Sequence, residues 1–248
     1  MEIKNSIALV TGANRGIGRR FVTELQRRGA AKIYAATRRP QDLDLPGVVA
    51  IQLDVTDDAS VAAAATAADD VTLLINNAGV STFARLTDGA MPDIRKEMET
   101  NYFGTLRMVR AFAPVLAAGG GGAVLNVLSV MAWMGYEHSN SYSASKAAAW
   151  ALTNGIRLEL AGQGTQVTGL AMASVDTDMM ATIDTDKTDP ELIARRALDG
   201  LQDRALEVLA DEQTAAWKAR LGDDPALLYP QVATIRQGGP QITYDHAG

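Results

Sequence analysis

Cysteine is absent from this 248-residue chain, and histidine occurs only twice, at His138 and His246. The lack of cysteine excludes disulfide bonds, thiolate metal sites and a cysteine nucleophile. Two histidines are too few for a multi-histidine zinc site, so we expect no bound metal. No apolar run reaches the ~18 residues needed to span a bilayer. The N-terminal segment also lacks the apolar core and cleavage site of a signal peptide, so we expect a cytoplasmic protein.

Neither sign of charge dominates, with 23 basic and 29 acidic side chains and a net charge of −6. This balance gives no electrostatic reason to expect nucleic acid or an anionic membrane as a partner. Apolar residues make up 47% of the chain and charged residues 21%, which argues against disorder. Because no Pro- or Ser-rich linker and no internal repeat interrupts the sequence, residues 1–248 are expected to form one domain.

Short apolar runs alternate with longer stretches of helical pattern. Several of these runs are apolar at consecutive positions, which is typical of parallel strands covered on both faces. The expected strands are Ile7–Val10, Lys32–Ala36, Val48–Leu53, Leu73–Asn76, Ala123–Leu128 and Val167–Met172. The expected helices are Arg19–Arg28, Ser60–Ala68, Met91–Ala117 and Tyr142–Ala161. This alternation predicts a doubly wound parallel α/β sheet, a three-layer Rossmann fold.

A glycine-rich turn, Thr11–Gly18, joins the first expected strand to the first expected helix. Glycine permits the dihedrals of such a turn and lets a pyrophosphate approach the backbone and the helix N-terminus. A glycine triplet alone is a weak signal, but the strand before it and the helix after it strengthen the prediction. The expected dinucleotide contacts are Gly12, Asn14, Arg15, Gly16, Ile17 and Gly18. A glycine turn without a ligand is the alternative.

Arg38 and Arg39 stand where an NAD-binding fold places an acid for the ribose 2′-hydroxyl, and the first acid after them is Asp42. Guanidinium groups suit a 2′-phosphate, which a carboxylate would repel. Arg15, in the glycine turn, can reach the same region. We therefore expect NADP (NADPH) rather than NAD as the cofactor. The alternative is that Arg38 and Arg39 are solvated loop charges.

Two further segments end expected strands at the carboxyl edge of the sheet, where such folds bind ligands. Asp54 can accept a hydrogen bond from the adenine amino group, and Asn76–Gly79 adds two amides and a glycine. The expected cofactor contacts from these segments are Asp54, Val55, Asn77, Ala78 and Gly79. Either segment can instead be a loop whose side chains satisfy local backbone groups.

Tyr142 and Lys146 open an expected helix at positions i and i+4, on one face and ~6 Å apart along its axis. A tyrosine with its usual pKa of ~10 is a poor acid or base at neutral pH. A nearby lysine cation, together with an oxidised nicotinamide ring, stabilises the phenolate and lowers that pKa. Ser129, which ends the preceding strand, can donate a hydrogen bond to a substrate carbonyl. A Tyr-x-x-x-Lys pair in isolation is weak evidence.

Together these segments resemble the single-domain branch of the short-chain dehydrogenase/reductase family, roughly over residues 5–180. The motifs that carry the resemblance are Thr11–Gly18, Asp54, Asn76–Gly79, Asn101, Ser129 and Tyr142–Lys146. The resemblance implies that Tyr142 is the general acid and that Ser129 orients and polarises the carbonyl. It implies that Lys146 lowers the pKa of the tyrosine and holds the nicotinamide ribose. Asn101 would position a water in a proton relay from Lys146; a helix kink held by the asparagine is the alternative.

Two segments depart from the family pattern. After the sixth expected strand, Ala173 and Ser174 replace the usual Pro-Gly pair, whereas Val175 and Thr177 fit and are expected to contact the cofactor. The chain also lacks the Val-Asp-Gly-Gly-like ending that many relatives have. We expect an extended tail at residues 236–248. Tetramerisation is therefore not carried over from the family, and the oligomeric state stays open.

The substrate pocket is expected between the loop after Ser129 and a substrate-loop region of about 177–200. Its expected lining is Val130, Met131, Trp133, Tyr136, Met179 and Met180. Such large apolar and thioether side chains favour a hydrophobic carbonyl compound. The alternative is that Trp133 and the methionines pack in the core or in a dimer contact.

The sequence thus predicts an NADP-dependent carbonyl reductase, or ketoreductase, that reversibly interconverts a ketone or aldehyde and an alcohol. One alternative is a non-catalytic NADP-sensing protein that binds a partner, but such a sensor has no need for Ser129, Tyr142 and Lys146. The other is a dehydrogenase of the same family that mainly oxidises a steroid or sugar-like alcohol.

Overall fold

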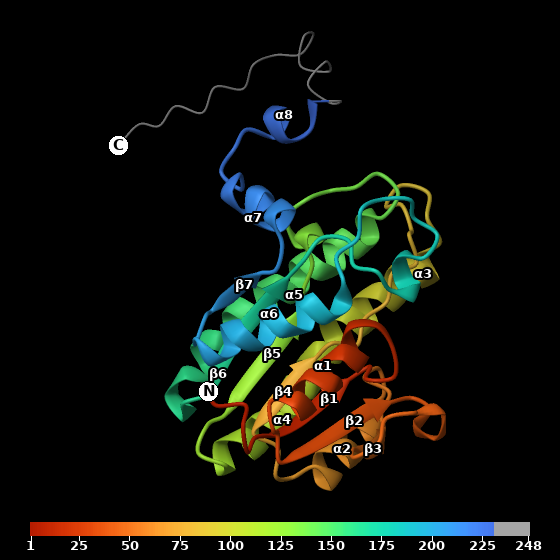
Figure 1. Ribbon diagram of the computed structural model, residues 1–248. Coiled ribbons are helices and arrows are strands. Elements are labelled where there is room, and N and C mark those ends of the chain that lie inside the picture. The colour runs from red at the N-terminus through yellow and green to blue at the C-terminus, as the bar shows by residue number, and fades with distance from the viewer. Residues whose placement is uncertain (231–248) are drawn as a thin grey trace.

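The structure, a computed structural model, describes residues 1–230, and all of its strands form one parallel sheet (Figure 1). The order across the sheet is β3-β2-β1-β4-β5-β6-β7. The strands are β1 (Ile7–Thr11), β2 (Lys32–Thr37), β3 (Val49–Gln52), β4 (Leu73–Asn76), β5 (Ala123–Val127), β6 (Gln166–Ala171) and β7 (Glu207–Leu209). The expected doubly wound α/β fold is confirmed. The tail expected at 236–248 lies outside the described residues.

Helices connect the strands. The α-helices are α1 (Gly16–Arg27), α2 (Asp58–Ala67), α3 (Met91–Met98), α4 (Thr105–Ala118), α5 (Asn140–Glu159), α6 (Pro190–Gln202), α7 (Glu212–Ala219) and α8 (Pro225–Leu228). Short 3₁₀ turns are η1 (Pro40–Asp42), η3 (Val130–Ala132), η4 (Ala161–Gln163) and η5 (Asp178–Met180). A π-helical segment, η2 (Glu99–Gly104), joins α3 to α4. No helix within residues 1–230 is long and apolar enough to cross a membrane.

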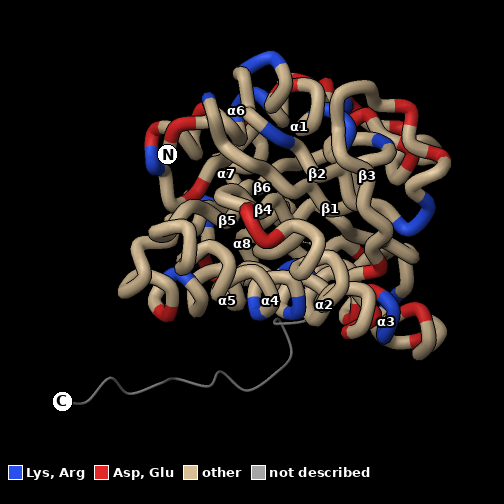
Figure 2. The backbone as a smooth tube through the Cα atoms, turned by 90° about the horizontal axis from the view of Figure 1, so that it is seen from below, with Lys and Arg blue, Asp and Glu red and all other residues tan. Residues whose placement is uncertain are grey.

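The sheet separates two hydrophobic cores, with α1 and α6 on one side and α2, α4 and α5 on the other (Figure 2). Along β1, Ala8 and Val10 belong to the core beneath α1 and α6, whereas Leu9 belongs to the opposite core. All three side chains are fully buried. The need to fill both cores explains why the central strands are apolar at consecutive positions.

Six strands lie within two residues of their predicted bounds, while β7 has no counterpart among the expected strands. The single helix expected over Met91–Ala117 is divided by the π-helical segment around Asn101. A π-helical turn inserts an extra residue into the helical repeat and often marks a functional position. The helix expected to begin at Tyr142 begins two residues earlier, at Asn140.

The substrate-loop region expected at about 177–200 is a loop only as far as Asp189, and this boundary was therefore wrong. Helix α6 begins at Pro190, and the Asp189 side chain caps it by accepting a hydrogen bond from the Glu191 N–H at 2.8 Å. Apolar side chains along one face of this helix, including Ile193 and Leu198, are fully buried in the core shared with α1. Residues 190–200 are therefore part of the scaffold.

The carboxyl ends of the central strands meet at one edge of the sheet. Strands β2 and β3 lie on one side of β1, and β4 to β7 lie on the other. The direction of winding therefore reverses between β1 and β4, and ligands of open α/β sheets bind in the crevice at such a point. The segments that follow β1, β4, β5 and β6 carry most of the expected site residues.

Candidate active site

The turn after β1 requires glycine for two different reasons. Gly12 and Gly16 have φ angles of +66° and +53°, a region that side chains with a Cβ rarely adopt. Gly18 is required by packing, because a Cβ there would lie 2.2 Å from the Gly12 carbonyl oxygen. The helix can therefore start close to the strand only with glycine at this third position. Between them, Asn14 and Arg15 are exposed and Ile17 is half-buried against the core.

Asn77 and Thr11 hold this turn in place. The Asn77 amide Nδ2 donates to the carbonyl oxygens of Thr11 at 2.9 Å and Gly12 at 3.2 Å. The Thr11 hydroxyl oxygen accepts from the N–H groups of Asn77 at 3.0 Å and Ala78 at 2.9 Å. The Asn77 side chain is thus engaged by the protein, as in the alternative where amides satisfy local backbone groups. Its amide therefore fixes the shape of the glycine turn.

The N-terminus of α1 is the part of the turn that suits a phosphate. Its N-cap residue, Arg15, makes no side-chain capping bond, and its first turn contains no acidic residue. By contrast, α2, α6 and α7 are each capped by an aspartate side chain, from Asp57, Asp189 and Asp211. The N–H groups and positive dipole end of α1 are therefore left for an anion. This donor set and the glycine cradle fit the pyrophosphate of a dinucleotide.

A hollow of about 410 Å³ lies beside the carboxyl ends of β2 and β3. Its lining residues are Arg38, Gln52, Asp54, Asp57, Ser60 and Ala63. Asp54 Oδ1 accepts hydrogen bonds from the Thr56 N–H at 2.9 Å and the Thr56 hydroxyl at 2.7 Å. Burial opposes ionisation of Asp54, but these bonds and the charge of Arg38 hold its pKa below the usual value. An ionised carboxylate therefore faces a cationic guanidinium across a space that an adenosine could occupy.

The two arginines after β2 differ in their surroundings. Arg38 lines the hollow, whereas the Arg39 guanidinium pairs with Asp42 at 3.1 Å on the exposed η1 turn. A bound 2′-phosphate would therefore meet Arg38 without competition from that aspartate. Val55, expected as a further cofactor contact, is buried and packs against Gly104 of the π-helical segment.

The loop after β6 closes over the glycine turn. Arg15 Nη1 lies 2.9 Å from Asp178 Oδ2, and a Cβ at Gly16 would lie 3.3 Å from the Thr177 methyl carbon. Val175 is buried and pairs with Thr188 in an isolated bridge. The structure therefore brings Thr177 against the turn after β1, whereas Val175 anchors the loop to the scaffold.

Ser129, Tyr142 and Lys146 come together at the carboxyl end of β5. Ser129 follows this strand, and its hydroxyl oxygen accepts a hydrogen bond from the Met131 N–H at 3.1 Å. Against the raising effect of burial, the same hydroxyl lowers the pKa of Tyr142. Lys146 Nζ lies 5.6 Å from the centre of the Tyr142 ring and donates to the Val127 carbonyl oxygen at 2.9 Å. Three groups able to bind or move a proton thus lie together at this end of the strand.

Burial determines the protonation of these groups. It raises the pKa of Tyr142 well above its usual value, an effect that the Ser129 hydrogen bond opposes and the charge of Glu97 strengthens. Burial also lowers the pKa of Lys146 to about 8. The phenol is therefore protonated at neutral pH, so it already carries the proton that a general acid donates.

Asn101 lies in the π-helical segment and is buried. Its Nδ2 donates to the Val80 carbonyl oxygen and to Ser145 Oγ, both at 2.9 Å, and its Oδ1 accepts from the Val80 N–H at 2.9 Å. The side chain thus supports the loop after β4. A Cβ at Gly79 would lie 3.2 Å from Asn101 Oδ1 and 3.7 Å from Lys146 Nζ, so glycine keeps the space beside the lysine open.

The six residues expected to line a substrate pocket do not all face open space. Val130 is buried, and Trp133 packs edge-to-face on Trp150 at 6.2 Å, with Lys218 Nζ 4.4 Å from its ring centre. Trp133 therefore packs beneath α7, in line with the packing alternative. The remaining four are accessible: Met131 and Met180 are half-buried, and Tyr136 and Met179 are exposed.

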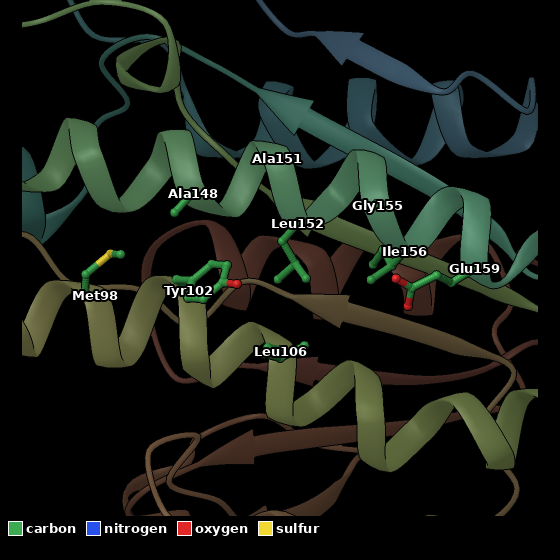
Figure 3. Close-up of a pocket in the computed structure, with 9 residues that line it drawn as sticks. All are labelled: Met98, Tyr102, Leu106, Ala148, Ala151, Leu152, Gly155, Ile156 and Glu159. Atoms are coloured by element: carbon green, nitrogen blue, oxygen red, sulfur yellow. The ribbon is translucent and has the colours of Figure 1, made fainter.

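A second hollow lies away from Ser129, Tyr142 and Lys146. It measures about 670 Å³ and lies between the α3–α4 segment and α5 (Figure 3). Figure 3 shows Met98, Tyr102 and Leu106 on one side, opposite Ala148 and Leu152 on the other. None of Ser129, Tyr142 and Lys146 lines it.

Two residues close to these segments escape prediction from the sequence. Tyr229 accepts a hydrogen bond from the Gly135 N–H at 2.9 Å, so the segment after α8 holds the loop that follows Ser129. Glu97 is fully buried beneath the start of α5. In the sequence Glu97 is simply a charged residue within an expected helix. Such a residue usually lies on the solvated face of the helix.

Comparison with known proteins gives consistent matches. Residues 6–188 match the short chain dehydrogenase family. A short chain dehydrogenase from Burkholderia cenocepacia, solved in complex with NADP, is 38% identical, with a TM-score of 0.89 over 94% of this chain and 99% of the other. An uncharacterised oxidoreductase of Staphylococcus aureus is 30% identical over 80% of this chain and 92% of its own. The NADPH-dependent 1-acyldihydroxyacetone phosphate reductase of Schizosaccharomyces pombe is 33% identical, over 70% of this chain and 61% of its own.

Proposed function

The chain belongs to the short chain dehydrogenase family of oxidoreductases, and we propose that it is an NADP-dependent carbonyl reductase. Its substrate would be a small molecule with a ketone or aldehyde group, reduced reversibly to an alcohol. The observation that carries the proposal is the arrangement of Tyr142 and Lys146 beside the carboxyl end of β5, where Lys146 Nζ lies 5.6 Å from the centre of the Tyr142 ring and donates to the Val127 carbonyl oxygen.

In this proposal Tyr142 is the general acid. The Ser129 hydroxyl donates a hydrogen bond to the substrate carbonyl oxygen and polarises the carbonyl. When bound, NADPH supplies the hydride that the carbonyl carbon accepts. Tyr142 gives its phenolic proton to the oxygen, which completes the alcohol, and the phenolate then takes a proton from solvent. The positive charge of Lys146 stabilises that phenolate. Oxidation of the alcohol runs through the same steps in reverse.

The choice of NADP rests on charge. In this proposal Arg38 and Arg15 supply guanidinium groups to the ribose 2′-phosphate, and Asp54, which lines the same hollow as Arg38, accepts from the adenine amino group. The related reductase of Schizosaccharomyces pombe uses NADPH, and the Burkholderia cenocepacia relative binds NADP. Bidentate guanidinium–phosphate contacts would favour NADPH over NADH.

The substrate class rests on the accessible side chains of the pocket. Met131, Met179 and Met180 offer flexible thioethers that adapt to several apolar shapes. We therefore propose a hydrophobic carbonyl compound. The arrangement of Ser129, Tyr142 and Lys146 favours a reductase over a non-catalytic sensor, because a sensor has no use for a proton donor.

Loss of reduced cofactor, followed by its absorbance, tests the proposal with a panel of aryl, aliphatic and cyclic ketones. NADPH-dependent turnover with little NADH turnover is the expected result. Preference for NADH would overturn the assignment of Arg38 and Arg15. NADPH binding without turnover of any member of the panel would favour the sensor.

A further inference from the structure

Glu97 is the one buried residue of α3, and its carboxylate has no exposed surface. No ion pair involves it within residues 1–230. Instead it accepts hydrogen bonds from the Thr82 N–H at 2.5 Å, from the Thr82 hydroxyl at 2.9 Å and from the Ser141 hydroxyl. Burial of an acidic group without a cation costs free energy. The hydrogen bonds from its hydroxyl and amide partners must therefore offset that cost.

Asn101, one helical turn after Glu97, makes hydrogen bonds to the same two segments of the chain. Asn101 bonds both backbone groups of Val80 and also Ser145 Oγ. Each of the two side chains therefore joins the loop after β4 to α5. We call these six residues the two-rung bridge: Val80, Asn101 and Ser145 form one rung, and Thr82, Glu97 and Ser141 form the other.

The spacing of the two-rung bridge fits its three elements. Glu97 and Asn101 are four residues apart, as are Ser141 and Ser145, and such pairs share a helix face. Val80 and Thr82 are two residues apart, which places both on one side of an extended segment. Ser141 and Ser145 immediately precede Tyr142 and Lys146 in the chain. The bridge therefore fixes the rotation of α5 that points the tyrosine and lysine into the pocket.

The backbone next to the bridge is strained. Phe83, which follows Thr82, has a φ angle of +56°, and bulky residues rarely adopt this region. Such a conformation persists only where the surroundings hold it in place. The paired hydrogen bonds from Thr82 to Glu97 supply that restraint on one side. On the other, the Ser141 N–H donates to the Ala84 carbonyl oxygen at 3.3 Å.

We propose that Glu97 is a positioning residue of the active site, which aligns Tyr142 through Ser141 and Thr82. This inference rests on the proposed role of Tyr142 as the proton donor. It adds to that role a residue outside the Ser129, Tyr142 and Lys146 set, from a different helix.

The charge of Glu97 has a definite sign of effect. Burial is the main cause of the raised pKa of Tyr142, and Glu97 raises it further, against the Ser129 hydrogen bond. Of the elements around Glu97, α5 contributes Tyr142 and Lys146 as titratable groups, whereas Val80–Phe83 carries none. Removal of the charge therefore lowers the pKa of Tyr142. Ketone reduction needs the protonated phenol. As the pH is raised, its decline would therefore begin at a lower pH than in the wild type.

Three variants separate charge from connectivity. Glu97→Gln keeps an oxygen that accepts from Thr82 and places an amide N–H that can donate to Ser141 Oγ. It therefore removes the charge and reverses the direction of the Ser141 hydrogen bond. Glu97→Ala removes the rung. Glu99→Gln is the matched control, because Glu99 lies two residues further on and pairs with the Arg107 guanidinium at 2.6 Å. Circular dichroism establishes that each variant is folded, and Glu97→Gln keeps the test available where Glu97→Ala does not fold.

The first readout is the pH profile of kcat/KM for ketone reduction. We expect the alkaline limb to move to lower pH in Glu97→Gln and to stay in place in Glu99→Gln. In Glu97→Ala, kcat is expected to fall by about tenfold or more through misplacement of the phenol, with little change in the Kd for NADPH. An unmoved limb in a folded Glu97→Gln protein would overturn the electrostatic part of the inference.

The second readout does not need turnover. Amide hydrogen exchange at residues 80–84 and 139–146 is expected to accelerate in Glu97→Ala and to stay unchanged in Glu99→Gln. Unchanged exchange in Glu97→Ala would overturn the positioning role. A wild-type protein that reduces no ketone would refute the proposed function, and the exchange result would still decide whether Glu97 holds the two segments together.

Discussion

Arg15 and Asp178 form an ion pair between the turn after β1 and the loop after β6, with Arg15 Nη1 2.9 Å from Asp178 Oδ2. Arg15 belongs to the turn after β1, and Asp178 begins the η5 turn after β6, far away in the chain. Both side chains are about two-thirds exposed, at 66% and 67%. Such an exposed pair is readily exchanged for a stronger partner. The 2′-phosphate of NADPH would compete with Asp178 for the same guanidinium.

Removal of this competitor should tighten NADPH binding. In Asp178→Asn, Arg15 is freed for the phosphate, so we expect the Kd for NADPH to fall a few-fold and the Kd for NADH to stay unchanged. Fluorescence titration of the reduced cofactor measures both constants. Asp184→Asn removes the same charge from an exposed position in the same loop and serves as control. Equal effects on NADPH and NADH would contradict the competition.

Arg38 should discriminate between the two cofactors. We expect Arg38→Ala to weaken NADPH binding by roughly 10- to 100-fold, the range for loss of a charge-assisted hydrogen bond, and to leave NADH binding unchanged. Arg39→Ala should have a smaller effect, because Arg38 lines the hollow beside β2 and β3 and Arg39 does not. Isothermal titration with both cofactors compares the variants. A larger loss from Arg39→Ala would reverse the assignment.

Gly18 should tolerate no side chain. A Cβ there would overlap the Gly12 carbonyl oxygen at 2.2 Å, so Gly18→Ala must push the α1 N-terminus away from β1. We expect a stability loss of about 1–3 kcal/mol and markedly weaker NADPH binding. Thermal unfolding and cofactor titration measure these changes. Gly162→Ala is the control, since no atom lies within 4 Å of its added Cβ; an equal loss there would contradict the steric argument.

Glu24 should stabilise the fold in a pH-dependent way. Its hydrogen bond from Arg27, together with Arg28, outweighs burial and lowers its pKa to about 2. Because the folded pKa is depressed, the stabilisation is present above the usual carboxyl pKa of 4.5 and disappears as the pH falls towards 2. Glu24→Gln should therefore cost about 1.5–3 kcal/mol at neutral pH. Denaturant unfolding at several pH values checks this, and a cost that persists in acid would contradict it.

The sequence predicts the parts of this molecule that local chemistry dictates. Strands such as β1 and β4 are buried on both faces, so their continuous apolar runs identify them. The glycine turn is recognisable because φ angles at Gly12 and Gly16 demand glycine. Helix α6 also carried a local signal, the Asp189 cap followed by Pro190 and a helical apolar repeat. The expected substrate-loop region of about 177–200 covers these residues, so no helix is predicted there.

Other features depend on contacts between distant segments, which no local pattern records. Strand β7 has only three half-buried residues and exists because Gly169–Ala171 offers a partner edge. The sequence predicts that Trp133 lines the substrate pocket, and only the fold shows that its ring packs against Trp150 and Lys218. Glu97 likewise reads as a surface charge, because only the folded chain brings Thr82 and Ser141 to its carboxylate.

The most direct test of the account is the substitution Tyr142→Phe, which deletes the phenolic oxygen and keeps the ring. We expect NADPH binding close to that of the wild type and ketone reduction lower by at least about a hundredfold, the lower end of a general acid's contribution. Tyr102→Phe removes the same atom outside the pocket and should retain activity. Substantial ketone reduction by folded Tyr142→Phe protein would contradict the role of Tyr142 as proton donor.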